Sequence, residues 1–168
     1  MVSKTRAIAL GGMLAAVCLV ILCMGGLIPF ATYVCPMLCI VVQYIVYALC
    51  GKGIAWSWYA VVAILALLLG PDKEAAGVFA LMGYYPMLKP IFEGWPISWL
   101  WKLLMFNASV AALYACLLRL MGLEQVAAEF AAVGAVGLVV LLVLGNVTFF
   151  LLDRLLSIVS KKWNRKER

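Results

Sequence analysis

Three charged residues, Asp72, Lys73 and Glu74, stand together in a chain that has few charges. Carboxylates are stabilised at the positive end of a helix dipole, so one interpretation is that these residues begin a helix in contact with water. The other interpretation is that the three charges line the mouth of a cavity that holds a polar or zwitterionic small molecule. Tyr84 and Tyr85 follow a few turns along the same predicted helix, and they would add aromatic walls and hydroxyl groups to that cavity.

Polar side chains also occur inside the apolar runs, at Gln43, Asn107 and Asn146. In lipid such groups usually face other helices and bridge them by hydrogen bonds. If several of them converged, they would instead contact a ligand, and the sequence leaves both interpretations open. The apolar, uncharged segment from Ile28 to Tyr33 is the candidate lid for a cavity next to Asp72.

The residue types that most enzymes and metal sites use are sparse. The chain has no histidine, which is the commonest general base, and it has no nucleotide-binding loop. Its six cysteines lie inside apolar runs and form no C-x-x-C pair, which is typical of packing residues. Cys35 and Cys39 share a helical face and are the best candidates for a soft metal ion. We nevertheless expect no enzymatic activity, no metal and no cofactor.

The composition indicates a membrane protein. Of 168 residues, 68% are apolar and 12% are charged, whereas a soluble domain carries about 25% charged residues and about half apolar ones. A small fold cannot hide that excess of apolar side chains because most of it is surface. The net charge of +6 comes largely from the basic tail, residues 159–168, which next to a helix indicates anchoring at an anionic cytoplasmic surface and not nucleic-acid binding.

The apolar runs predict an all-α bundle of about six transmembrane helices in one domain, because a span needs about 20 apolar residues. The expected helices cover residues 7–28, 32–49, 54–69, 75–92, 97–121 and 131–158. The fourth contains Pro86 and Pro90, and proline removes a backbone donor and kinks a helix. A kinked span and a re-entrant segment therefore both remain open for residues 75–92.

The distribution of basic residues predicts the topology. With six crossings and the amino terminus in the cytoplasm, eleven basic residues face the cytoplasm and only Lys73 and Arg119 face outward. The positive-inside rule strongly favours this arrangement, whereas five crossings would place the basic tail outside. We expect a multi-pass protein of the plasma membrane with both termini in the cytoplasm.

Small residues recur every four positions at Ala7, Gly11 and Ala15, close to the basic start of the chain. Such spacing lets helices approach closely in lipid, which suits packing within the bundle or contact with a partner. With six short helices and both ends inside, this start resembles the S components of energy-coupling factor (ECF) transporters, although Gly11 departs from the alanine of their motif.

The resemblance implies that Ala7, Gly11 and Ala15 contact a coupling transmembrane subunit, and that separate ATPase subunits drive uptake. It also implies that the outer loops bind a vitamin or other small micronutrient. We therefore expect a substrate-binding membrane subunit of an ECF-type importer. The alternative is a non-transporting membrane scaffold that acts through helix–helix contacts. The expected substrate-binding residues are Tyr33, Gln43, Asp72, Lys73, Glu74, Tyr84, Tyr85, Asn107 and Asn146.

The predicted topology can be tested by cysteine labelling in a background that lacks the native cysteines. A Lys73→Cys variant should react with an impermeant thiol reagent in intact cells, because residue 73 faces outward. Cysteines at Ser3 and Lys166 should be protected in the same cells. Labelling at position 166, or protection at position 73, would contradict the topology.

Overall fold

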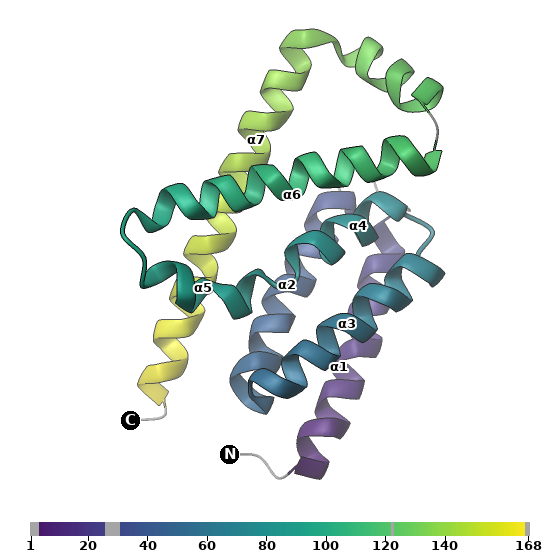
Figure 1. The fold of residues 1–168 in the computed structure, drawn as a ribbon. Helices are drawn as coiled ribbons and strands as arrows, with labels where there is room; N and C mark the ends of the chain where they lie inside the picture. The colour runs from purple at the N-terminus through teal and green to yellow at the C-terminus, as the bar shows by residue number, and fades with distance from the viewer. Residues whose placement is uncertain (1–3, 26–30, 122, 167–168) are drawn as a thin grey trace. The chain divides into compact units, whose positions relative to one another are not determined.

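The computed structural model describes residues 4–25, 31–121 and 123–166, which are helical over most of their length (Figure 1). Within these ranges it does not describe the side chains of residues 4, 31, 117–118, 120–138, 141 and 162–166. No strand occurs among the described residues. The helices are α1 (Lys4–Met24), α2 (Ala31–Cys50), α3 (Lys52–Leu69), α4 (Lys73–Met82), α5 (Tyr85–Glu93), α6 (Ser98–Met121) and α7 (Leu123–Lys166).

Five helices of the described part of the chain are long and apolar enough to cross a membrane. The candidate spans are Thr5–Met24, Thr32–Cys50, Lys52–Leu69, Ser98–Cys116 and Leu142–Lys161. Two other helices, α4 and α5, have 10 and 9 residues. At a rise of about 1.5 Å per residue, neither alone reaches across a hydrocarbon core of about 30 Å.

Most predicted helix boundaries lie within a few residues of the observed ones. The expected helix 7–28 ends earlier, since α1 stops at Met24, and residues 26–30 lie outside the described part. The expected helix 131–158 is part of the longer α7. The main difference is at 75–92, which we predicted as one helix and which the structure divides into α4 and α5.

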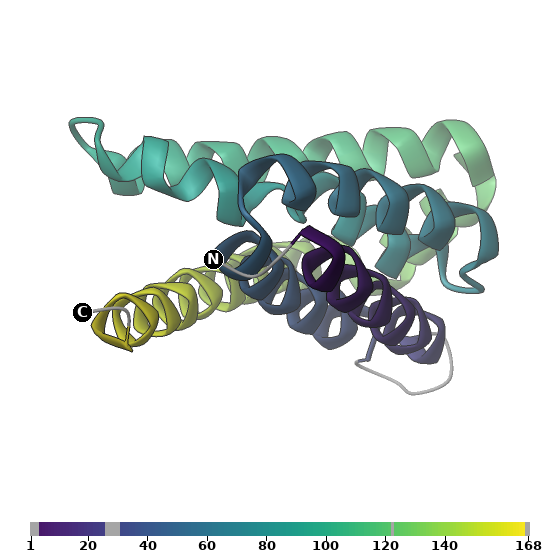
Figure 2. The same ribbon diagram turned by 90° about the horizontal axis from the view of Figure 1, so that it is seen from below.

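The chain divides into two compact units, Met1–Pro96 and Ile97–Arg168. In the first unit α2 lies at the centre, where it contacts α1, α3, α4 and α5. Figure 2 shows α1 beside both α2 and α3. The core of this unit includes the fully buried side chains of Ile40, Val62, Phe79 and Tyr85.

Specific side chains fix the interruption between α4 and α5. Tyr59 of α3 donates a hydrogen bond from its hydroxyl to the carbonyl of Ala80, near the end of α4. A β-carbon at Gly83 would stand 2.9 Å from the Tyr59 ring, so glycine lets the ring pack against the break. Pro86, at the start of α5, has no N–H to donate to the carbonyl four residues earlier. The break is therefore encoded by contacts that a continuous helix would lose.

The second unit is an antiparallel pair formed by α6 and α7. Lys102 Nζ lies 3.1 Å from Asp153 Oδ2, and the rings of Phe106 and Phe149 stack with centroids 4.7 Å apart. From Lys102 to Phe106 the residue number on α6 rises, while that of the partner on α7 falls from Asp153 to Phe149. The two helices therefore run antiparallel. Both charged side chains are mostly buried, with 11% and 20% exposed. An ion pair so placed offsets part of the cost of holding each charge among apolar helices.

Candidate functional site

Asp72 begins α4. Its carboxylate Oδ1 accepts hydrogen bonds from the backbone N–H groups of Glu74 and Ala75, each at 3.0 Å. These are two of the amide groups that have no partner within the first turn of a helix. The interpretation that the charged segment starts a helix is confirmed.

Tyr33 and Glu74 meet across the ends of two helices. The Tyr33 hydroxyl donates to Glu74 Oε1 at 2.7 Å, which joins the start of α2 to the first turn of α4. Lys73 forms no ion pair with either carboxylate, and its ammonium group donates to the carbonyl of Leu67 at 2.8 Å. No ion pair to Asp72 or Glu74 is found among the described residues. We call Tyr33, Asp72 and Glu74 the acidic cluster.

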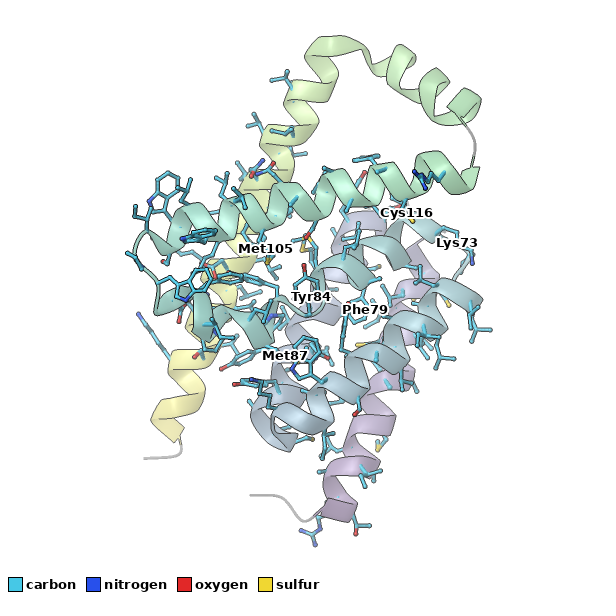
Figure 3. The ribbon with its side chains drawn as sticks, in the orientation of Figure 1. Lys73, Phe79, Tyr84, Met87, Met105 and Cys116 are labelled. Carbon is cyan, nitrogen blue, oxygen red and sulfur yellow. The ribbon has the colours of Figure 1, made fainter. Side chains whose placement is uncertain are left out.

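Tyr84 and Tyr85 do not lie beside the acidic cluster, contrary to the prediction. They lie beyond the far end of α4, and Figure 3 shows Tyr84 well separated from Lys73. The Tyr84 ring packs edge-on against Tyr59, with centroids 6.2 Å apart, and Tyr85 is completely buried. The ten residues of α4 span about 15 Å, so these tyrosines and the carboxylates do not form one site wall.

Gln43 is completely buried in the core of the first unit. Its Nε2 donates to the carbonyl of Ala55 at 3.0 Å and contacts Met87 Sδ at 3.5 Å. Its Oε1 has no hydrogen-bond partner among the described residues. Ala55 is near the start of α3, and Asp72 follows the end of α3. Gln43 therefore lies well away from the acidic cluster.

Asn107 and Asn146 converge on each other. Asn107 Nδ2 donates to Asn146 Oδ1 at 3.0 Å, and Asn146 Nδ2 donates back to Asn107 Oδ1 at 3.3 Å. Each amide also donates to the carbonyl four residues earlier in its own helix, at 2.8 Å. All four amide N–H groups thus have acceptors, and the arrangement is the helix bridge that polar side chains form in lipid.

The cysteines pack between helices. Cys39 Sγ lies 3.5 Å from the carbonyl of Cys18, and both residues are completely buried. Cys50 Sγ lies 3.5 Å from the carbonyl of Ala7. The described residues contain no group of three or more side chains able to hold a metal ion. Cys39 therefore packs against α1.

The small-residue stripe on α1 is used inside the first unit. Ala7 is 4% exposed, and the carbonyl of Gly11 accepts a 2.8 Å hydrogen bond from Trp58 Nε1 of α3. A β-carbon at Gly11 would stand 3.6 Å from the Trp58 ring. Ala15 is half-buried. Ala7 and Gly11 thus pack mainly against their own neighbours.

An open groove runs beside this stripe, between α1 and α3, with a volume of about 400 Å³. We call it the α1–α3 groove. Its lining includes Ile8, Gly12 and Ala15 of α1 and Gly53, Ile54 and Ser57 of α3. The α3 half was missed by the sequence analysis, although Gly53 and Ser57 carry the same four-residue spacing of small residues.

No protein-family model, curated protein or solved structure matches the chain.

The Asp72 carboxylate both caps α4 and carries a negative charge, and two substitutions separate these roles. Asp72→Ala removes the acceptor for two backbone N–H groups and should lower the free energy of unfolding by about 1 kcal/mol. Asp72→Asn keeps a good capping side chain and should cost only a few tenths. Thermal unfolding of the purified protein in detergent measures both. Equal stability of the alanine variant and the parent would show that the cap contributes nothing.

Proposed function

We propose that the chain is the substrate-binding membrane subunit of an ECF-type importer. It captures a small micronutrient from outside and passes it to a separate coupling and ATPase module. The acidic cluster carries the proposal, because two carboxylates stand together at one end of the first unit and form no ion pair among the described residues. The five apolar helices support insertion in the membrane.

The topology that suits this role has both termini in the cytoplasm and the acidic cluster outside. It requires six crossings of the plasma membrane. The pair α4 and α5 supplies the sixth, since together they cover residues 73–93, about the length of one span. The split of eleven basic residues against two supports that orientation.

The cluster suits a substrate that carries an ammonium group. The two carboxylates outweigh the single positive charge of Lys73, whose ammonium group donates to the carbonyl of Leu67, so the net charge offered to a ligand is negative. Exposed ion pairs contribute only about 0–1 kcal/mol, and useful affinity therefore needs partial removal of water around the carboxylates. The segment from Ile28 to Tyr33 is the proposed cover, and its residues up to 30 lie outside the described part.

A non-transporting scaffold is the second candidate, favoured by the α1–α3 groove. A scaffold would need the groove for helix contacts, but it would have no use for carboxylates that lack an ion pair among the described residues. Substitutions in the acidic cluster therefore separate the two functions.

The test is small-molecule binding by charge-neutral variants that keep the fold. Protein purified from cells grown in rich medium is analysed by mass spectrometry for a retained amine, whose affinity is then measured by titration. Asp72→Asn and Glu74→Gln should each weaken binding at least tenfold, which is about 1.4 kcal/mol, because each removes one negative charge from the ligand.

Lys73→Gln is the matched control, since Lys73 lies between these residues in sequence but donates to a backbone carbonyl. It should bind the amine at least as tightly as the parent does, because it removes a positive charge and no carboxylate. Unchanged binding in both acidic variants, or a preparation that retains no small molecule, would contradict the importer and favour the scaffold.

A further inference from the structure

Arg154 of α7 carries a positive charge inside a candidate membrane span, Leu142–Lys161. Its neighbour Asp153 is already paired, because Lys102 Nζ lies 3.3 and 3.1 Å from the two oxygens of that carboxylate. The guanidinium of Arg154 forms no ion pair and no hydrogen bond with any described residue. Charged side chains within a membrane are normally paired, because lipid stabilises an isolated charge poorly. The counter-ion of Arg154 therefore comes from outside the described residues.

The surface around Arg154 is apolar. Leu152 and Leu156 are buried, but on the exposed side of α7 Arg154 stands between Leu151 and Ile158, which are 62% and 60% exposed. In a membrane these exposed side chains contact acyl chains. A molecule that reaches the guanidinium from this side therefore has to be compatible with hydrocarbon.

A second cation shares this face of the helix. Lys161 is exposed and follows Arg154 by seven residues, which is two turns and about 10 Å along the axis. Phe150 lies one turn before Arg154 on the same face, and the Arg154 Cζ atom stands 5.9 Å from the centre of its ring. This cation–π contact holds the guanidinium at the helix surface and leaves its N–H groups to a ligand. We call Phe150, Arg154 and Lys161 the basic face of α7.

Two tryptophans indicate the depth of this face in the membrane. Trp99 and Trp101 stand next to Lys102 at the start of α6, and both are exposed. Exposed tryptophan concentrates at the boundary between hydrocarbon and water, which is also where lipid phosphates lie. Because Lys102 pairs with Asp153, the adjacent Arg154 lies close to the same boundary. The nearest anion that a membrane supplies there is a phospholipid phosphate.

We propose that the basic face of α7 binds the headgroup of an anionic phospholipid. The planar guanidinium of Arg154 donates to two phosphate oxygens, a geometry that arginine favours, and the acyl chains lie along the exposed leucines beside it. A zwitterionic phospholipid has the same phosphate, but Lys161 would repel its cationic group. The site therefore selects lipids with a net negative charge, and this selection does not depend on the proposed function of the chain.

The test is native mass spectrometry of the purified full-length protein in detergent, with added phosphatidylglycerol or phosphatidylcholine of identical acyl chains. The parent should retain phosphatidylglycerol about tenfold more tightly than phosphatidylcholine. Arg154→Gln should weaken phosphatidylglycerol binding about tenfold, which is about 1.4 kcal/mol. Lys161→Gln should reduce the preference between the two lipids. Arg119→Gln, an exposed arginine in the last turn of α6, is the matched control and should bind as the parent does.

Thermal unfolding without added lipid checks that each variant keeps the fold. Arg154→Lys is the second variant, since it keeps the charge but loses the planar fork, and it should bind phosphatidylglycerol less tightly than the parent. Parent-like binding of phosphatidylglycerol by both Arg154 variants would overturn the proposal.

Two other results would also overturn it. Equal retention of the two lipids by the parent would leave a carboxylate of another protein as the counter-ion. Displacement of phosphatidylglycerol by an excess of inorganic phosphate would show that the site takes free anions.

Discussion

Lipid offers no hydrogen-bond partner, so every backbone N–H and C=O group at membrane depth must find one inside the protein. Within a helix these groups bond one another, but the N–H and C=O groups at each helix end have no partner in the helix. The interruption between α4 and α5, which lies outside the five candidate spans, is closed by the hydroxyl of Tyr59, which donates to the carbonyl of Ala80. Gly83 leaves room for the Tyr59 ring, and the arrangement of the first unit depends on this packed break.

The same constraint explains how polar side chains are used. Trp58 Nε1 bonds the carbonyl of Gly11, and the amides of Asn107 and Asn146 bond each other. Only the nitrogen of the Gln43 amide is hydrogen-bonded, because its Oε1 has no partner in the described structure. A buried polar atom without a hydrogen bond typically lowers the free energy of unfolding by about 1–3 kcal/mol. The acidic cluster differs from all of these because its charges stand at the helix ends, where water or a ligand can reach them.

Much of this arrangement could be predicted from the sequence. Runs of apolar residues identify the five long helices, and Asp72 followed by Glu74 predicts a helix start. Pro86 predicts an interruption of the helix. The residue that stabilises the interruption, Tyr59, is distant in sequence, and no sequence pattern near Pro86 points to it. Four-residue spacing shows that Ala7, Gly11 and Ala15 share a face, but it cannot show which face another helix already covers. Gly11 packs against Trp58, and the glycine with free space beside it is the next residue, Gly12.

The sealed interruption can be tested most directly by hydrogen exchange of the protein in lipid nanodiscs. Backbone amides exchange only when water reaches them and their hydrogen bonds open. Residues 80–86 should exchange as slowly as the middle of α3, whereas residues 70–74 should exchange quickly, and Tyr59→Phe should speed exchange in 80–86 alone. Fast exchange of residues 80–86 in the unsubstituted protein would show that the break is open to water, and it would contradict a bundle whose polar groups are paired within the chain.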